Sequence, residues 1–472
     1  MIIKKNEIHK IEIIDLSGDG QGIGKIDGYI LFVEGVIPGD FIEVKIIKTN
    51  KNYGYGKLIK IISPSADRIT PKCKIFKHCG GCSLQYMSYE AQLIHKRKTV
   101  KDCIERIGGF KDIYCENYPE KLINEAIGMD NPYNYRNKAQ FPVKKNALHN
   151  FSEIGFYAKR SHNVINIDSC DISHEINDKI INIFRQFIDK NIKKYMPYDE
   201  ITHTGLIRHI FTRVGFHSGE IMVCVVINGD NLPDCGELIN KLSQIKNMTS
   251  IMLNTNKEKT NVILGDKTKP LWGSDYITDY IDGKKFKISV NSFYQINPLQ
   301  TEKLYKKALE FAELTSSNIC IDAYCGIGTI SIMFAPYVKK IYGIEIIPQA
   351  VSDAIENAGL NNITNAEFIT GKSEEIIPEI INNNNGEKID LIIVDPPRKG
   401  CDIKLLDSII ESKTEKLIYI SCDPATLARD IKILTQNSNN QNSVYKLEKI
   451  QPFDMFPHTM HVETVALLKL VK

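Results

Sequence analysis

Short apolar runs that end at polar residues recur through the C-terminal part of the chain. Residues 391–394, 417–420 and 464–468 are such runs, rich in Leu, Ile and Val. Compact apolar runs of this length predict buried strands. Helical spacing of apolar residues at 299–313 and 349–358 predicts helices in the same region. This alternation indicates an α/β fold, in which residues 291–472 form a doubly wound sheet that ends in a hairpin.

The first 62 residues show a different pattern, with short apolar strands separated by glycine-rich turns. The predicted strands cover 11–14, 29–33, 41–47 and 56–62. Even strand spacing with Gly and Pro in the turns is typical of a small OB-like β-barrel. Such barrels often bind single-stranded nucleic acid through basic and aromatic side chains. The segment supplies both kinds, at Lys48, Lys51, Tyr53, Tyr55 and Lys57.

The middle of the chain, residues 63–290, has the weakest pattern. A helix is predicted at 89–107, with a basic face formed by Lys96, Arg97, Lys98 and Lys101. Residues 205–215 and 221–227 read as antiparallel strands. Because 472 residues are too many for one core, we expect three domains: a barrel at 1–62, a central α+β domain at 63–290 and the α/β domain at 291–472.

Charge is unevenly distributed, although the net charge of the chain is only +3. The stretch from Lys45 to Lys101 holds 13 basic and two acidic residues, which gives it a net charge of +11. A stretch with this charge is more typical of a surface that binds a polyanion such as nucleic acid than of a solvated surface with no partner.

Composition narrows the class of protein. No apolar run is long enough to span a membrane, and the N-terminus has no apolar signal core. We therefore expect a cytoplasmic protein that makes no membrane contact. In that compartment the 12 cysteines indicate thiol, metal or cluster chemistry rather than a disulfide framework.

Three residues with chemical potential stand at predicted strand ends. Cys422 follows the strand 417–420, and Pro424 opens a helix directly after it. A helix N-terminus would lower the pKa of the thiol and make it a nucleophile, whereas an isolated cysteine is most often a core residue. Asp395 and Glu463 stand at the ends of two further strands. If these strands are neighbours, the three residues share one cleft.

A cysteine cluster lies downstream of the barrel. Cys73, Cys79 and Cys82 form the pattern C-x5-C-G-G-C, and the glycines allow a tight wrap around a metal. Cys170 is the best candidate for a fourth ligand. Four cysteines suit zinc as well as a [4Fe–4S] cluster, so the spacing leaves both open.

A nucleotide-type cofactor is indicated by the strand, glycine turn and helix that follow residue 319. Asp322 precedes the turn Gly326-Ile-Gly328, and Glu345 ends the next strand about 20 residues on, as ribose hydroxyls require. Two acids around a G-x-G turn favour S-adenosylmethionine. NAD is the competing ligand, disfavoured because the third glycine of its fingerprint is missing.

Five motifs together resemble the RNA uracil-5-methyltransferases. They are Ser292-Phe-Tyr-Gln-Ile-Asn297, Asp322-Ala-Tyr-Cys-Gly-Ile-Gly328, Val394-Asp-Pro-Pro-Arg398, Ser421-Cys-Asp-Pro-Ala-Thr-Leu-Ala-Arg-Asp430 and His461-Val-Glu463. The barrel, with Gly18-Asp-Gly-Gln-Gly and Val36-Ile-Pro-Gly39, resembles an RNA-binding TRAM domain. The chain is most similar to the type that methylates 23S ribosomal RNA and carries a [4Fe–4S] cluster. The C-terminal sheet is then expected to be a Rossmann-like class I methyltransferase fold.

The resemblance implies roles for ten residues. Cys422 would add to C6 of uracil, and Glu463 would remove the C5 proton. S-adenosylmethionine would be held by Gln295, Tyr324, Glu345 and Asp395. The resemblance selects iron–sulfur over zinc for Cys73, Cys79, Cys82 and Cys170. Asp423 departs from the family, which usually has Asn there, and this puts one local hydrogen bond in question.

Three other interpretations of the function remain. The related transfer-RNA enzymes share the catalytic half and are expected to lack both barrel and cluster. An RNA cytosine-5 methyltransferase would leave Glu463 without a clear role. A non-catalytic RNA-binding protein would leave the pair of Cys422 and Glu463 unexplained. We expect a monomer with 23S ribosomal RNA as its substrate and no obligate protein partner.

Overall fold

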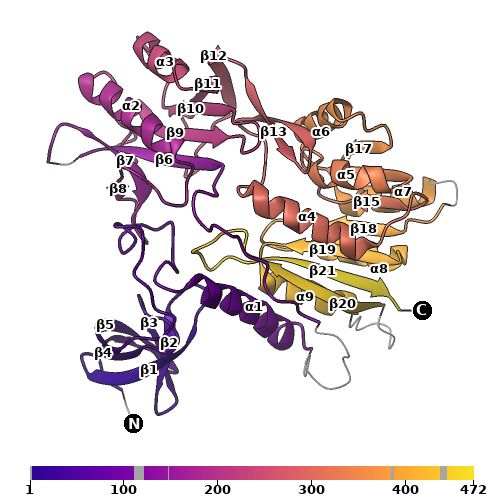
Figure 1. Cartoon of the computed structure of the whole chain (residues 1–472), viewed down its shortest axis with the longest axis horizontal. Helices are drawn as coiled ribbons and strands as arrows, with labels where there is room; N and C mark the ends of the chain where they lie inside the picture. The colour runs from indigo at the N-terminus through magenta and orange to yellow at the C-terminus, as the bar shows by residue number, and fades with distance from the viewer. Residues whose placement is uncertain (1–2, 111–121, 147, 384–386, 436–443, 472) are drawn as a thin grey trace.

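The computed structural model describes residues 3–110, 122–146, 148–383, 387–435 and 444–471. These residues form a closed barrel, two seven-stranded sheets and a two-stranded hairpin. In Figure 1 the barrel and the middle sheet lie on one side of the molecule and the C-terminal sheet with its helices on the other. Among the described helices, none is both long and apolar enough to cross a bilayer.

The N-terminal barrel has five strands, closed in the order β1-β2-β3-β5-β4. Their bounds are β1 (Ile8–Leu16), β2 (Gly22–Ile26), β3 (Tyr29–Val33), β4 (Phe41–Thr49) and β5 (Tyr53–Ser63). The pattern of apolar residues missed β2, which lies in the glycine-rich segment. The glycines are needed there because a Cβ on Gly22 would stand 2.4 Å from Val36 Cγ2. At Gly22 and Gly24 the strand therefore presents backbone, not side chains, to its neighbours.

The C-terminal sheet has the order β17-β16-β15-β18-β19-β21-β20, and β21 runs antiparallel to both of its neighbours. The strands are β15 (Ile319–Asp322), β16 (Lys340–Glu345), β17 (Ala366–Thr370), β18 (Leu391–Val394), β19 (Lys416–Ser421), β20 (Tyr445–Phe453) and β21 (Glu463–Leu470). The helices around it are α4 (Pro298–Ala312), α5 (Thr329–Phe334), α6 (Pro348–Leu360), α7 (Ser373–Asn383), α8 (Ile403–Ser412) and α9 (Pro424–Thr435). The α/β fold with a C-terminal hairpin is thereby confirmed.

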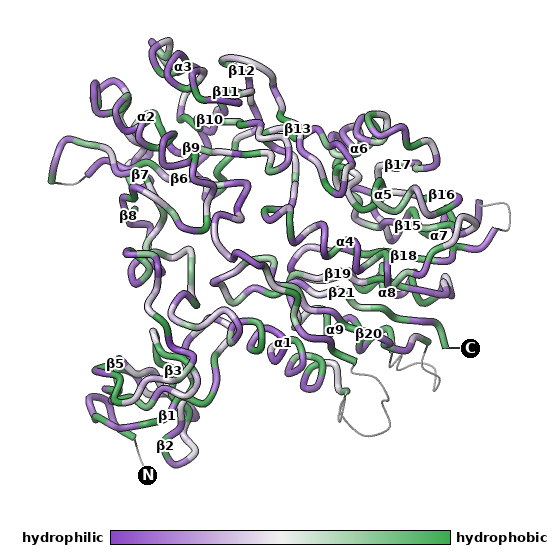
Figure 2. The backbone as a smooth tube through the Cα atoms, viewed as in Figure 1, coloured by the Kyte–Doolittle hydropathy of each residue, from purple (hydrophilic) through white to green (hydrophobic). Residues whose placement is uncertain are grey.

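The central strands β18 and β19 carry apolar residues on both faces because helices cover both faces of the sheet. Ile418 and Ile420 of β19 pack in the core on the side of α4 and α5. Leu417 and Tyr419 of the same strand pack in the core on the side of α8 and α9. Figure 2 shows these strands as hydrophobic stretches, whereas the surrounding helices change between hydrophobic and hydrophilic along their length.

The middle sheet has the order β12-β11-β10-β9-β6-β7-β8. Its strands are β6 (Lys138–Lys145), β7 (Ser152–Tyr157), β8 (Val164–Asn166), β9 (Ile207–Val214), β10 (Ile221–Ile227), β11 (Met248–Thr255) and β12 (Lys267–Gly273). Its helices are α2 (Ile176–Lys190) and α3 (Gly236–Ser243), and a hairpin of β13 (Tyr276–Ile281) and β14 (Lys284–Ser289) follows. The expected antiparallel pairing of β9 with β10 is confirmed, whereas β10 and β11 pair in parallel.

The middle and C-terminal sheets share an apolar core. Phe211 and Met222 from the middle sheet belong to the same buried cluster as Ile393 and Ile418 from the C-terminal sheet. A shared core limits sliding of the two sheets past each other, because interiors are packed as densely as crystals. The domain boundaries placed at residues 62 and 290 stay a prediction.

Helix α1 (Tyr89–Arg106) lies between the barrel and the C-terminal sheet (Figure 1). Its buried positions follow the helical spacing of four residues, through Gln92, Lys96, Val100 and Ile104. The sequence suggested that Lys96 belongs to an exposed basic face, and this prediction is wrong. Its ammonium is fully buried and forms an ion pair with Asp454, which is buried as well. The same ammonium donates to the carbonyl of Phe456 at 3.1 Å.

Replacing Lys96 by Met tests the importance of this buried pair. The Lys96→Met variant should lose about 3–5 kcal/mol of unfolding free energy, because Asp454 is left as an unpaired buried carboxylate. The double variant Lys96→Met/Asp454→Leu should recover most of the loss. Urea unfolding followed by circular dichroism measures both.

Lys98→Met is the matched control on the same helix. Lys98 is 44% exposed and pairs with Asp15 and Asp102 at the surface, so its loss should cost less than about 1 kcal/mol. Equal destabilisation by Lys96→Met and Lys98→Met would contradict a special role for the buried pair.

Candidate active site

Three strand ends meet at one edge of the C-terminal sheet. Asp395 directly follows β18, Cys422 directly follows β19, and Glu463 is the first residue of β21. Strands β18, β19 and β21 are neighbours in the sheet, and Ser421 is the Cα partner of Thr464 across β19 and β21. The structure thus brings together the three residues that the sequence singled out.

The turn around Cys422 is organised by Asp423. Its carboxylate oxygen Oδ1 accepts hydrogen bonds from the backbone N–H groups of Ala425 at 2.9 Å and Thr426 at 3.0 Å. Asp423 is therefore the N-cap of α9. An Asn side chain carries an equivalent carbonyl oxygen, so this capping contact is one that Asp and Asn can both make.

A cation is held next to the thiol by the loop after β18. Arg429 of α9 donates to the carbonyl of Lys399 at 3.0 Å, and the backbone N–H of Cys401 donates to the buried carboxylate of Asp430 at 2.8 Å. These contacts fix the loop that carries Arg398. Arg398 acts electrostatically on both Cys422 and Glu463. The sequence quoted Arg398 within a motif but gave it no role.

Burial is the main cause of the raised pKa values of the carboxyl groups at this edge of the sheet. It raises the pKa of the Glu463 carboxyl to about 8, with the charge of Asp395 adding to the effect and Arg398 opposing it. Burial together with the charge of Asp322 raises the pKa of Asp395 to about 7. Carboxyls with such pKa values can accept or give up a proton near neutral pH.

The thiol differs from the sequence expectation. Burial, with the charges of Glu463 and Asp395 adding to it, raises the pKa of Cys422 to about 11, and Arg398 opposes the rise. The expected lowering by the helix N-terminus was wrong. The physical reason is that burial and the two carboxylates outweigh the helix N-terminus, whose amides at Ala425 and Thr426 donate to Asp423.

A second group of residues surrounds the glycine turn after β15. The carboxylate of Glu345 accepts from the backbone N–H of Gly326 at 3.2 Å and of Ile347 at 3.0 Å. Asp322 is fully buried, and its Oδ2 accepts from the hydroxyl of Ser331 at 2.6 Å. Its other oxygen, Oδ1, has no hydrogen-bond partner among the described residues. Burial raises the pKa of Asp322 to about 6.

The remaining two predicted cofactor residues flank this region. Tyr324 lies in the same turn, half-buried against the core under α7 to α9. Gln295 lies before α4, and its backbone carbonyl accepts from the side-chain amide of Asn137 at 2.8 Å. This contact joins the residue before β6 to the segment before α4.

The four predicted cluster ligands line one cavity of about 280 Å³, at Cys73, Cys79, Cys82 and Cys170. The backbone N–H of Gly81 donates to Cys79 Sγ, and the side-chain amide of Gln85 donates to Cys82 Sγ, both at 3.4 Å. Burial raises the pKa of the Cys82 thiol to about 12. No group of three or more His, Cys, Asp or Glu side chains in the described part of the chain is placed so that it could hold a metal ion.

A larger cleft of about 940 Å³ runs between the barrel, the middle sheet and the candidate active site. Gly20 and Glu34 line it from the barrel, Arg136 and Arg160 from the middle segment, and Arg398 from the C-terminal sheet. Its wall is rich in arginine, the residue type that binds phosphates.

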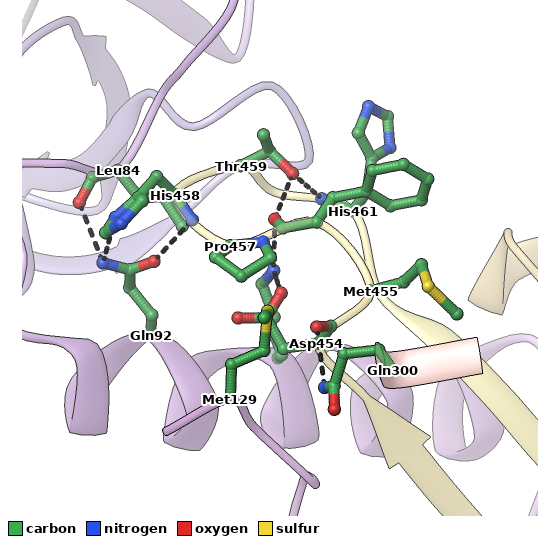
Figure 3. A network of polar contacts seen from close by, with 12 residues as sticks. Leu84, Gln92, Met129, Gln300, Asp454, Met455, Pro457, His458, Thr459 and His461 are labelled. Carbon is green, nitrogen blue, oxygen red and sulfur yellow. Dashed lines mark hydrogen bonds and ion pairs between the residues drawn. The ribbon is translucent and has the colours of Figure 1, made fainter. Parts of the chain in front are cut away.

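The loop between β20 and β21 is held from several sides (Figure 3). Gln92 of α1 donates to the ring of His458 and accepts from its backbone N–H. The backbone N–H groups of Ser83 and Leu84, next to Cys82, both donate to the carbonyl of His458. Because Glu463 follows this loop, its position depends on contacts made hundreds of residues earlier in the chain. No sequence signal identified this network.

Comparison with known proteins gives consistent results over the whole chain. The model of the tRNA (Uracil-5-)-methyltransferase family matches residues 130–471, and the TRAM domain model matches residues 4–59. An uncharacterized RNA methyltransferase of Clostridium tetani is 48% identical over 468 residues, which are 99% of this chain and 97% of the relative. An uncharacterized RNA methyltransferase of Listeria innocua is 46% identical over 469 residues, 99% of each chain.

One solved structure is similar over nearly the full length. It is the tRNA (uracil-54, C5)-methyltransferase of Pyrococcus abyssi in complex with S-adenosyl-L-homocysteine. The TM-score is 0.75 at 28% sequence identity, and the match covers 98% of this chain and 100% of the other. The match therefore includes the barrel, so the expectation that transfer-RNA enzymes lack a barrel is wrong for this neighbour.

Alkylation of Cys422 should report the charges around it. Below the pKa of the thiol the rate of reaction with iodoacetamide should rise about tenfold per pH unit, because only the thiolate reacts. Glu463→Gln removes a negative charge and should lower the pKa of Cys422, which speeds alkylation at pH 9–10. Arg398→Gln removes a positive charge and should slow it. Mass spectrometry of the peptide that contains Cys422 measures the rate.

Asp407→Asn serves as the control, since Asp407 is an exposed acid on α8. Its rate profile should match that of the unmodified protein. If Glu463→Gln and Arg398→Gln shift the profile in the same direction, the opposite effects of the two charges on Cys422 are refuted.

Proposed function

Because the chain belongs to the tRNA (Uracil-5-)-methyltransferase family, whose members are S-adenosylmethionine-dependent RNA methyltransferases, we propose that it methylates C5 of a uridine in 23S ribosomal RNA. The product is 5-methyluridine. The observation that carries the proposal is the meeting of Cys422 and Glu463 at adjoining ends of β19 and β21. A thiol and a buried base side by side suit covalent catalysis on a pyrimidine ring.

Cys422 acts as the nucleophile. Its thiolate adds to C6 of the uracil ring, and the C5–C6 double-bond electrons move to form an enolate, which makes C5 nucleophilic. S-adenosylmethionine, when bound, supplies the electrophilic methyl group that C5 takes up. Burial and the neighbouring carboxylates raise the pKa of Cys422, and the charge of Arg398 opposes the rise and so favours the thiolate.

Glu463 acts as the general base that removes the proton from C5 after methylation. The electrons of that C–H bond re-form the C5–C6 double bond, and Cys422 leaves as thiolate. A carboxylate with a pKa of about 8 is a much stronger base than an exposed one. Since the carboxyl is mostly protonated below that pKa, this step should quicken as the pH rises towards 8.

The residues around the glycine turn fit S-adenosylmethionine. Glu345 lies at the end of β16, where a carboxylate can accept from ribose hydroxyls. The buried Oδ1 of Asp322 lacks a partner among the described residues and can accept from a donor on the ligand. Asp395 adds a carboxylate that favours a cationic sulfonium. We assign Gln295 and Tyr324 to the same site because they flank it.

A [4Fe–4S] cluster on Cys73, Cys79, Cys82 and Cys170 is part of the proposal. The cysteines line one cavity, and two N–H groups are directed at their sulfurs, as is usual for cluster thiolates. Arg136 and Lys138 line the same cavity and suit the negative charge of a cysteine-ligated cluster. The cluster would supply structural cross-linking, since methyl transfer needs no electron carrier.

Transfer RNA is the second candidate substrate. The solved neighbour acts on uridine 54 of transfer RNA, according to its name, and aligns with the barrel as well as the catalytic part. The barrel therefore does not separate the two substrate classes. The choice of 23S ribosomal RNA rests on similarity to the cluster-bearing type.

Mapping of 5-methyluridine decides between the substrates. Ribosomal RNA and transfer RNA from cells with and without this protein are digested and analysed by mass spectrometry. We expect 5-methyluridine to disappear from 23S ribosomal RNA and to persist in transfer RNA. Loss from transfer RNA alone would overturn the ribosomal assignment while leaving the chemistry intact.

Loss of Cys422 or Glu463 should stop the reaction at different points. Cys422→Ala should bind RNA but form no covalent adduct, because no thiolate attacks C6. Glu463→Gln keeps the shape of the side chain but not its basicity, so a methylated protein–RNA adduct should accumulate and survive denaturing electrophoresis. Turnover should fall by at least about 100-fold in both variants.

Asp423→Asn is the matched control in the same turn, since an amide oxygen can still cap α9. It should retain most of the activity and resolve its adduct. Residual turnover by Cys422→Ala would show that the nucleophile is misassigned. Normal turnover by Glu463→Gln without an adduct would point to another base, with Asp395 as the next candidate.

Iron analysis tests the cluster. Anaerobically purified protein should be brown and contain about four irons per chain. Cys170→Ser should lose iron, whereas Cys235→Ser, at a half-exposed cysteine outside the cavity, should keep it. Stoichiometric zinc with no iron would refute the cluster.

A further inference from the structure

Three aromatic rings gather on the outer surface of the barrel. Phe32 on β3 is the Cα partner of Tyr55 on β5, and Tyr55 is also the partner of Lys48 on β4. These three side chains therefore stand in one row across neighbouring strands. The ring centroids of Phe32 and Tyr55 are 5.8 Å apart, and Tyr53 meets both rings edge-on, at 5.8 Å and 5.9 Å.

The rings point outward because glycines occupy the inward positions of β5. A Cβ on Gly54 would stand 2.8 Å from the carbonyl oxygen of Lys48, and one on Gly56 would stand 2.3 Å from Val44 Cγ2. The apolar core of the barrel uses Leu31 and Val33 of β3 and not Phe32 between them. Tyr53 is 39% exposed. The fold of the barrel therefore does not require these rings.

The rings of Phe32 and Tyr55 line a trough of about 540 Å³. Lys48, Lys57 and Arg160 line the same trough, and Glu34 is its one acidic lining residue. Arg160 from the middle segment forms an ion pair with Glu34 at 2.8 Å. The ammonium of Lys48 lies 6.0 Å from the ring centroid of Tyr55. Aromatic faces flanked by an excess of cations suit a base stacked on a ring with phosphates on either side.

The trough continues into the large cleft, which is lined at its far end by Arg398 and His461 beside the candidate active site. Gln21, Glu34 and Arg160 line both spaces. A strand of RNA whose target uridine enters the cleft can therefore extend over the barrel without leaving the basic surface. This continuity favours RNA over an unrelated partner of the barrel.

We propose that Phe32 and Tyr55 form a stacking site for one unpaired base of the RNA substrate, with Lys48 and Lys57 contacting the adjacent phosphates. This inference rests on the proposed function for the identity of the substrate. Because every base has an aromatic face, the site tolerates any base and requires a single-stranded segment.

Binding of a fluorescently labelled single-stranded RNA to the full-length protein tests the site. The RNA is a fragment of the substrate that includes the target uridine and its unpaired neighbours, and fluorescence anisotropy gives the affinity. Tyr55→Ala should bind roughly 5- to 100-fold more weakly, and Tyr55→Phe should bind like the unmodified protein because the ring is kept. Phe41→Ala is the control, since Phe41 is a 38% exposed aromatic residue of β4 outside the trough.

Abasic substitution locates the stacked base. When the base that stacks on Tyr55 is removed from the RNA, Tyr55→Ala and the unmodified protein should bind equally. At every other position the difference between the two proteins should persist. A phosphate-only role of the barrel predicts the same difference at all positions and would overturn the stacking site.

Tyr55→Trp gives a direct signal that does not depend on a loss of binding. Trp272 is the single native tryptophan, so the variant is made together with Trp272→Phe. Stacking should quench the fluorescence of the new indole when RNA binds. RNA binding shown by anisotropy without quenching would refute the stacking site, as would equal affinities of Tyr55→Ala and Phe41→Ala.

These readouts are independent of methyl transfer. If the unmodified protein makes no 5-methyluridine, the proposed function fails while the binding comparison remains valid. If it methylates RNA and Tyr55→Ala binds with unchanged affinity, only the stacking site fails.

Discussion

The buried ion pair between Lys96 and Asp454 ties together segments that are 358 residues apart in sequence. A buried charge is stable only beside a partner of opposite charge. A shift of α1 relative to the loop after β20 would separate the two side chains and leave unpaired buried charges, at a large cost in free energy. Gln300 of α4 donates to the carbonyl of Asp454 from the other side at 2.9 Å. The start of the loop that leads to Glu463 is thereby fixed.

The same loop joins two sites that are distinct in their chemistry. Ser83 and Leu84 follow Cys82 of the cysteine cavity and donate to the carbonyl of His458. A ligand that orders the cysteine loop would therefore also stabilise the segment before Glu463. The proposed cluster would then have a structural role, although the proposed chemistry transfers no electrons.

Three carboxyl groups of the candidate site have pKa values raised by burial. Asp322, Asp395 and Glu463 have pKa values raised to between about 6 and about 8, and Arg398 is the cation that opposes the rise at Glu463. A cationic sulfonium would favour the ionised carboxylates. RNA phosphates would meet the arginines of the cleft and the lysines of the barrel. The charges of the site are therefore opposite in sign to those of the sulfonium and of the RNA phosphates.

The sequence by itself determined the α/β class, most strands of the barrel and of the C-terminal sheet, and the residues at the three strand ends. Those inferences rest on local properties: apolar runs such as 417–420, the proline after Cys422 and the order of strand and helix. Strand β2 was missed because its glycines carry no hydrophobic signal. The tertiary structure alone decided the burial of Lys96, the raised pKa of Cys422 and the row of Phe32, Tyr55 and Lys48. Each depends on which distant segments lie side by side, and no local pattern in the chain records that.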